Sequence, residues 1–167
     1  MRNLTLQKIS VAGLLICTAI LLGAAYIEMY YYLPPCPLCT LQRIFFGMLA
    51  LIFLLGSMIN WHKAYRYLYT LLILLFASTG FLIALRQFWL QYFAPPQQIS
   101  CGASLSRLME IYPFFTAIKA ALAGGTICSK VDFTILTMSL AGWSVILFGI
   151  FVIGTIYILY LQKKRRL

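Results

Sequence analysis

The chain has 167 residues, of which 63% are hydrophobic and only 10% are charged, and its mean hydropathy is +0.93. A soluble domain needs far more polar surface than this composition supplies, so a soluble fold is excluded and a polytopic membrane protein is expected. The net charge of +10 does not indicate nucleic-acid binding, because Lys and Arg gather at the ends of apolar runs, where positive charge sets membrane topology.

Four apolar stretches are long enough to cross a bilayer as helices, which takes about 20 residues. They cover about residues 9–31, 39–59, 67–85 and 142–161. The first resembles a signal peptide with a cleavage site near Ala25, but its apolar run is too long for one, and we expect it to remain as a span. We therefore expect an all-α fold, a single domain over residues 1–167 that forms a bundle of four transmembrane helices.

Lys and Arg near the span ends also predict the orientation. They lie in the N-terminal segment, in the turn 60–66 and in the tail 163–166. Both termini are therefore expected in the cytoplasm, with two loops, about 32–43 and 86–141, on the periplasmic face. Within the second loop, 111–123 is apolar but too short to span the bilayer, and we expect it to lie on the membrane surface.

Four of the five cysteines fall in the two predicted outer loops, where disulfides persist. Cys36 and Cys39 lie in the first loop, and Cys101 and Cys128 lie in the second. Cys17, in the middle of the first span, is expected to pack as a small apolar residue. The four outer cysteines are therefore the candidate catalytic residues.

Cys36-Pro37-Leu38-Cys39 is a C-x-x-C motif, whose small ring is typical of a redox-active disulfide. Proline suits the first turn of a helix, which would place Cys39 at the N-terminus of the second span, where unpaired N–H groups stabilise a thiolate. Arg43 follows one turn later and could stabilise that thiolate and an electron-rich ligand. The alternative is an arginine that extends to lipid headgroups. Glu28, the only acidic residue in a span, is expected to be an interfacial carboxylate.

Metal and structural roles are the alternatives for these cysteines. A c-type haem site needs His after the second cysteine, where Thr40 stands. A four-cysteine zinc site needs a second close pair, whereas Cys101 and Cys128 are 27 positions apart. No metal is therefore expected. A structural disulfide, an inert scaffold and a metal-binding transporter remain open at this point.

The chain resembles the disulfide bond formation protein B (DsbB) family of bacterial inner-membrane oxidases. The resemblance covers nearly the whole chain. It is carried by the string C-P-L-C-T-L-Q-R at 36–43, by Cys101 and Cys128, and by Asp132-Phe133 and the segment 139–143. Val131 stands where the family often has Trp. In vitamin K epoxide reductase-like proteins the loop cysteines precede the C-x-x-C, so the order of motifs argues against that family.

The resemblance implies a quinone-dependent disulfide oxidoreductase that reoxidises a periplasmic DsbA-like protein of thioredoxin fold. Cys101, paired with Cys128, would be attacked by this partner, and electrons would then pass to Cys36 and Cys39. Cys39 would face a membrane quinone, ubiquinone or menaquinone, which Arg43 would help to bind. The sequence does not distinguish a general DsbA from a dedicated paralogue.

Overall fold

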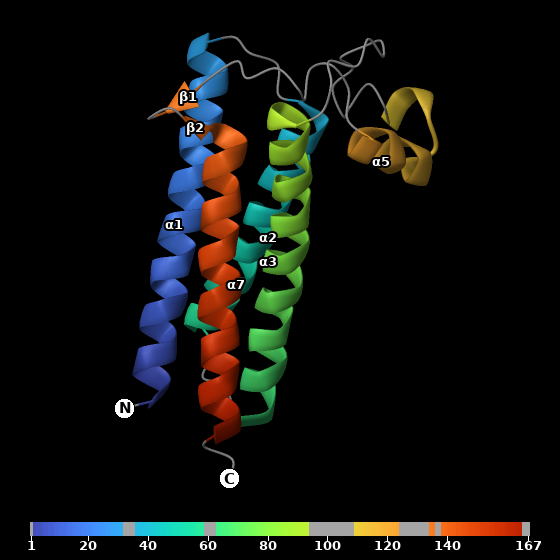
Figure 1. Ribbon diagram of the computed structural model, residues 1–167. Coiled ribbons are helices and arrows are strands. Elements are labelled where there is room, and N and C mark those ends of the chain that lie inside the picture. Colours follow the sequence, from blue (N-terminus) through green and yellow to red (C-terminus); the bar gives the residue numbers. More distant parts are fainter. Residues whose placement is uncertain are drawn as a thin grey trace.

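The computed structural model describes residues 2–31, 36–58, 63–93, 109–123, 134–135 and 138–164. Its framework is a bundle of long helices (Figure 1), which are α1 (Arg2–Tyr31), α2 (Pro37–Met58), α3 (Lys63–Tyr92) and α7 (Leu140–Lys164). Each of the four is long and apolar enough to cross a membrane. The predicted all-α, four-span membrane fold is confirmed.

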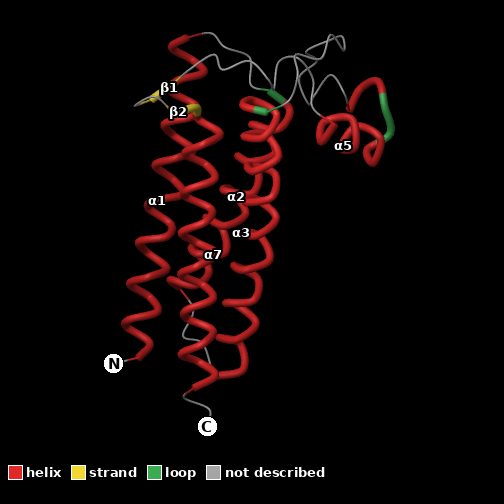
Figure 2. The backbone as a smooth tube through the Cα atoms, in the orientation of Figure 1, coloured by secondary structure: helices red, strands yellow, loops and turns green. Residues whose placement is uncertain are grey.

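The helices are arranged so that chain neighbours pack together. Helix α1 packs on α2, α2 packs on α3, and α3 packs on α7. The start of α1 and the end of α7 lie at the same end of the bundle, as an even number of spans requires (Figure 2). Helix α2 begins at the opposite end with the C-x-x-C motif, and we call this the cysteine end.

Aromatic rings in the middle of the bundle fill the space left by small residues. Phe46 of α2 stacks on Phe148 of α7, with ring centroids 4.0 Å apart and an interplanar angle of 18°. The Phe148 ring also covers Gly80 of α3 so closely that a Cβ there would collide with it. At Gly13 of α1 a Cβ would lie 2.8 Å from the Phe53 ring. Such close approach is how helices associate in lipid, where apolar burial gives little driving force.

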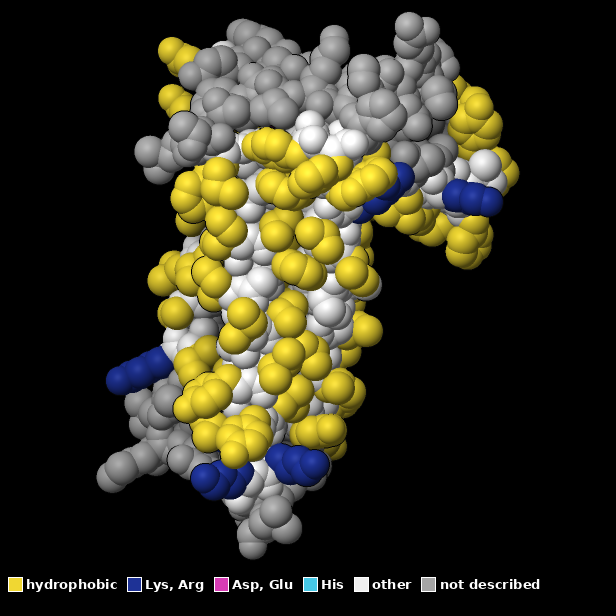
Figure 3. All heavy atoms as spheres, viewed as in Figure 1, with side chains coloured by type: hydrophobic (Ala, Val, Ile, Leu, Met, Phe, Trp, Pro, Cys, Tyr) yellow, Lys and Arg dark blue, Asp and Glu magenta, His cyan; other side chains and the backbone are white. Residues whose placement is uncertain are grey.

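Large apolar side chains cover the outside of the bundle. Figure 3 shows them along the whole middle of the visible face, with Lys and Arg side chains near the ends. Leu22, Leu82 and Ile153 are each more than 60% exposed. An apolar surface of this extent is stable only against lipid, so these side chains form the lipid-facing surface.

Several helix ends lie outside the predicted spans: α1 begins at Arg2 rather than near residue 9, α3 begins at Lys63 rather than near 67, and α7 ends at Lys164 rather than near 161. Helix α3 continues past Leu85 to Tyr92, because the polar groups that seemed to end the span have partners inside the protein. Arg86 lies over the Trp89 ring, and its Nε donates to the carbonyl of Leu122 at 3.4 Å. The long loop therefore begins about two turns later than the predicted residue 86.

Helices α2 and α7 both begin two residues earlier than predicted. Helix α2 starts at Pro37 rather than near residue 39. Helix α7 starts at Leu140 rather than 142, because the Ser139 hydroxyl accepts the Gly142 N–H at 3.2 Å and caps the helix.

The cysteine end also carries a pair of short strands and a short helix outside the bundle. Strands β1 (Thr134–Ile135) and β2 (Met138–Ser139) pair antiparallel, with Thr134 opposite Ser139, and the sequence analysis did not predict them. Helix α5 (Phe114–Ala123) has 10 residues, too short to span a membrane, as predicted. Its Phe115 is 85% exposed. The location of α5 on the membrane surface stays a prediction.

Candidate functional site

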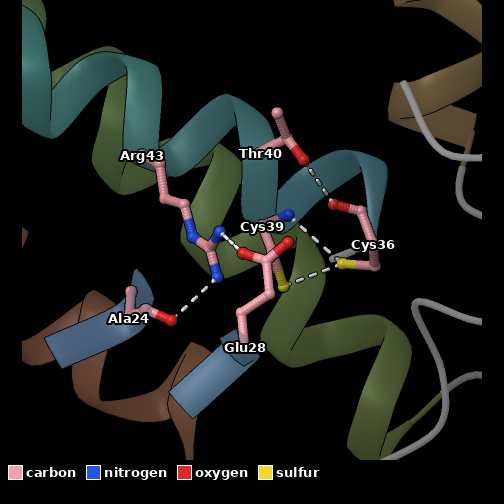
Figure 4. Close-up of polar contacts among 6 residues, drawn as sticks. All are labelled: Ala24, Glu28, Cys36, Cys39, Thr40 and Arg43. Carbon is pink, nitrogen blue, oxygen red and sulfur yellow. Dashed lines mark hydrogen bonds and ion pairs between the residues drawn. The ribbon is translucent and has the colours of Figure 1, made fainter. Parts of the chain in front are cut away.

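Cys36 caps the N-terminus of α2. Its carbonyl accepts the Thr40 N–H at 3.0 Å, the first hydrogen bond of the helix. Figure 4 shows that the same carbonyl also accepts the Thr40 hydroxyl at 3.2 Å and that Cys36 Sγ accepts the Cys39 N–H at 3.2 Å. Pro37 occupies the first helical position, where its missing N–H costs nothing. The Cys39 N–H at the helix N-terminus therefore bonds to the Cys36 sulfur. The sequence had led us to expect that the N–H groups at this helix end would stabilise a thiolate of Cys39.

The two sulfur atoms of the C-x-x-C motif lie in contact. Cys36 Sγ donates to Cys39 Sγ at 2.8 Å. A disulfide needs about 2.05 Å between the sulfurs, so a small movement converts this contact into a bond. Cys36 is only 6% exposed, whereas Cys39 is partly exposed. The motif can therefore alternate between dithiol and disulfide, and Cys39 is the more exposed of the two residues.

Two buried glutamines connect Cys39 to the interface between α2 and α3. Gln87 Nε2 of α3 donates to Cys39 Sγ at 3.0 Å, and Gln42 Nε2 of α2 donates to Gln87 Oε1 at 2.8 Å. Leu38 and Leu41 form the apolar cluster that holds the motif. The sequence analysis missed both amides as site residues. The signal for Gln42 was its place in the string at 36–43, inside a predicted span, and the signal for Gln87 was a glutamine just beyond the predicted end of a span.

Arg43 forms an ion pair with Glu28 of α1. Its Nη2 also donates to the Ala24 carbonyl at 3.3 Å (Figure 4). The two charged side chains are 31% and 33% exposed. The guanidinium therefore donates to two groups of α1, and Cys39 Sγ accepts from Gln87 and Cys36. Glu28 is thus more than an interfacial carboxylate, because it fixes the arginine beside the motif.

The remaining cysteines have separate positions. Cys17 is fully buried in the core of the bundle, as predicted. Cys101 and Cys128 lie outside the described residues, as does Val131. Within the described part of the chain, no group of three His, Cys, Asp or Glu side chains is placed to hold a metal ion.

A family model described as "Disulfide bond formation protein DsbB" matches residues 7–158. The chain belongs to the DsbB family. The resemblance that the C-x-x-C string indicated is thereby confirmed. As a DsbB-family member, the protein is a multi-pass membrane oxidoreductase of disulfide bond formation, which works together with a partner in that process.

Curated DsbB relatives match over most of their length. Disulfide bond formation protein B of Azoarcus sp. is 33% identical over 149 residues, which cover 89% of each chain. Disulfide bond formation protein B 1 of Pseudomonas aeruginosa is 36% identical over 142 residues, 85% of this chain and 87% of the relative. The Xylella fastidiosa protein of the same name is 37% identical over 137 residues, 81% and 79% of the two chains. The family match over residues 7–158 includes α2 and nearly all of α1, and it includes all of α3, so it covers the helices that carry the described site.

Proposed function

We propose that this DsbB-family protein reoxidises a DsbA-like thiol oxidase in the periplasm and passes the electrons to a membrane quinone. The observation that carries the proposal is the contact between Cys36 and Cys39 at the end of a membrane-spanning helix. A dithiol in this position can exchange with thiols on the aqueous side and still be reached from the lipid. That combination of access suits transfer of electrons from a soluble protein to a lipid-soluble acceptor.

The exchange with the soluble partner is assigned to Cys101 and Cys128 from the family resemblance. A partner thiolate attacks Cys101 of their disulfide, forms a mixed disulfide and releases Cys128 as a thiolate. The second partner thiolate then displaces Cys101, so the partner leaves oxidised and the pair is left as a dithiol. That dithiol reduces the Cys36–Cys39 disulfide by the same exchange, which moves two electrons to the helix end.

The residues around Cys39 are suited to receive these electrons. When the disulfide opens, one sulfur carries the negative charge of a thiolate. Cys39 Sγ accepts hydrogen bonds from Gln87 Nε2 at 3.0 Å and from Cys36 Sγ at 2.8 Å. Hydrogen bonds to a charged acceptor are the strong ones, so they favour the charge on Cys39. The reduced pair is therefore ready to give up its electrons at Cys39, the more exposed of the two residues.

The surroundings of Arg43 fit a quinone ring. Such a ligand needs a hydrogen-bond donor for its carbonyl oxygens and an apolar surface for its ring. Arg43 is about one third exposed and is held by Glu28 and the Ala24 carbonyl. Ile44, which follows Arg43 on α2, is 49% exposed and offers apolar surface beside it. A bound quinone, ubiquinone or menaquinone, would take up two electrons and two protons.

The proposed orientation places the cysteine end on the periplasmic face of the bacterial inner membrane and both termini in the cytoplasm. Lys163 and Lys164 lie in the last turn of α7, at the end of the bundle opposite the motif. Lys8 lies near the start of α1, at the same end. Positive charge at that end supports a cytoplasmic location by the positive-inside rule.

The proposal is tested with the purified protein, a reduced DsbA-like partner and ubiquinone. We expect quinone reduction, followed by its absorbance, and we expect Cys39→Ser to abolish it while membrane insertion stays normal. Trapping a mixed disulfide through Cys101 in a Cys128→Ser variant would identify the partner. Unchanged quinone reduction in Cys39→Ser would overturn the proposal.

A further inference from the structure

Gln42 and Gln87 form a chain of hydrogen bonds that ends on a sulfur atom. Gln42 donates to Gln87 at 2.8 Å, and Gln87 donates to Cys39 Sγ at 3.0 Å. Gln42 is 5% exposed and Gln87 is 2% exposed, so water does not compete for these bonds. We propose that Gln87 stabilises the Cys39 thiolate and that Gln42 is the positioning residue that holds the Gln87 amide in the required orientation.

The direction of the first hydrogen bond fixes the direction of the second. A glutamine amide has a carbonyl oxygen that accepts and an NH₂ group that donates. Because Gln42 donates to Gln87 Oε1, the NH₂ group of Gln87 must point toward Cys39. A donor held in place before the charge forms stabilises that charge without reorganisation, which is the principle of an oxyanion hole. Here the donor is the Gln87 NH₂ group, and the charge that it would stabilise forms on the Cys39 sulfur.

The inference rests on the proposed function, because it assigns the amides a role in the reduction of the Cys36–Cys39 disulfide. In that step an incoming thiolate bonds to one sulfur, the S–S bond breaks, and the other sulfur leaves as a thiolate. A donor at Cys39 Sγ favours Cys39 as the leaving sulfur. Gln87 is then a group that touches a reacting atom, whereas Gln42 acts through Gln87.

Amides between membrane helices can also serve only to hold the helices together. The protein contains such a pair at the other end of the bundle, where Gln162 Nε2 of α7 donates to Thr70 Oγ1 of α3 at 3.0 Å. A purely structural role predicts that losing the Gln87 amide lowers stability but leaves the reactivity of Cys39 unchanged. The reactivity of the thiol therefore separates the two roles, and Gln162 supplies a matched control.

The test uses the full chain with Cys36→Ser, Cys101→Ser and Cys128→Ser, so that Cys39 is the reactive thiol. Cys17 stays, because it is fully buried. The rate of Cys39 alkylation by iodoacetamide at about pH 7 reports its thiolate fraction, since the thiolate is the nucleophile. Gln87→Met keeps the length of the side chain but removes the donor. We expect it to slow alkylation by about tenfold, as loss of a hydrogen bond to a charged group implies.

Two further variants complete the set. Gln42→Met leaves the Gln87 donor in place but removes its anchor, so alkylation should slow by a smaller factor, about threefold. Gln162→Met should leave the rate within about twofold of the parent, because Thr70 lies far from the motif. At about pH 10 a larger fraction of the thiol is deprotonated in every variant, so the rates should move closer together.

An alkylation rate at about pH 7 that Gln87→Met leaves unchanged would overturn the inference. So would a slowing that persists in full at about pH 10, because it would reflect lost access rather than lost thiolate. If Gln87→Met does not fold, an unchanged rate in Gln42→Met overturns the inference instead. The assay contains neither partner nor quinone. The expected slowing of alkylation can therefore be absent while Cys39→Ser still abolishes quinone reduction. That pair of results would overturn the inference and still support the proposed function.

Discussion

The carboxylate of Glu28 on α1 forms an ion pair with the guanidinium of Arg43 on α2, one helical turn after Cys39. The pair joins the first two helices at the cysteine end. A second bond, from Arg43 Nη2 to the Ala24 carbonyl at 3.3 Å, orients the planar guanidinium further. The arginine that the sequence singled out is therefore held by two groups of α1, beside the C-x-x-C motif.

The fixed guanidinium leads to a prediction about Arg43→Lys. A lysine keeps the charge but has no planar fork, so it cannot bind Glu28 and the Ala24 carbonyl in the same geometry and also bind a quinone oxygen. We expect the KM for quinone to rise by about tenfold, as loss of one charge-assisted hydrogen bond implies, with a smaller change in kcat. Steady-state kinetics at varied ubiquinone concentration measure both.

The matched control for this prediction is Glu28→Gln, whose carbonyl oxygen still accepts from Arg43. The ion pair is about one third exposed, so losing its charge should cost at most about 1 kcal/mol of stability. The KM for quinone should change by less than in Arg43→Lys. A KM in Arg43→Lys equal to that of the parent would remove Arg43 from the proposed quinone site.

The cap at the start of α2 predicts that stability and activity separate at Cys36. Cys36→Ser keeps an acceptor for the Cys39 N–H, because a serine hydroxyl is a good N-cap. Cys36→Ala removes the acceptor and should lower the free energy of unfolding by about 1 kcal/mol relative to the serine variant. Both variants should fail to transfer electrons, since neither can form the disulfide.

Thermal unfolding in detergent, followed by circular dichroism, compares the two Cys36 variants. The cap assignment would be contradicted by equal unfolding temperatures for Cys36→Ser and Cys36→Ala. Quinone reduction by either variant would contradict the redox assignment instead.

Close packing in the middle of the bundle predicts that Gly80 cannot be replaced. A Cβ at Gly80 would meet the Phe148 ring, which also stacks on Phe46 at 4.0 Å. Gly80→Ala should therefore destabilise the bundle by about 1–3 kcal/mol, the usual cost of overpacking. Gly23 has no atom within 4 Å of the position of a Cβ. Gly23→Ala should be neutral or stabilising, because alanine favours the helix.

Unfolding of the two glycine variants by increasing denaturing detergent measures this difference. If Gly80→Ala is as stable as Gly23→Ala, the Phe148 ring does not hold the position that the structure assigns to it.

The features that could be predicted from the sequence are those that depend on local residues. Apolar runs long enough to cross a bilayer as helices predicted the four spans. The spacing of Cys36 and Cys39 predicted that their sulfur atoms would lie in contact. The end of α3 was not predictable, because Arg86 and Gln87 look like loop residues until their partners on other elements are known.

Contacts between distant residues account for the rest of what the sequence analysis missed. Gln87 reaches Cys39 across 48 positions of the chain, and Arg43 reaches Glu28 across 15. Neither pairing leaves a pattern in the sequence, because each results from how two helices pack. The stabilisation of the Cys39 thiolate by Arg43 stays a prediction, and packing adds the Gln87 amide at the same sulfur.

The central claim is that the Cys36–Cys39 pair alternates between disulfide and dithiol as electrons pass through it. The most direct measurement mixes oxidised protein with reduced partner, first without and then with ubiquinone. Acid stops the exchange, and the denatured protein is then alkylated at neutral pH for mass spectrometry. We expect Cys36 and Cys39 to become alkylated without quinone and to return to the disulfide when quinone is added. Quinone reduction by protein in which these two cysteines never become alkylated would contradict the account.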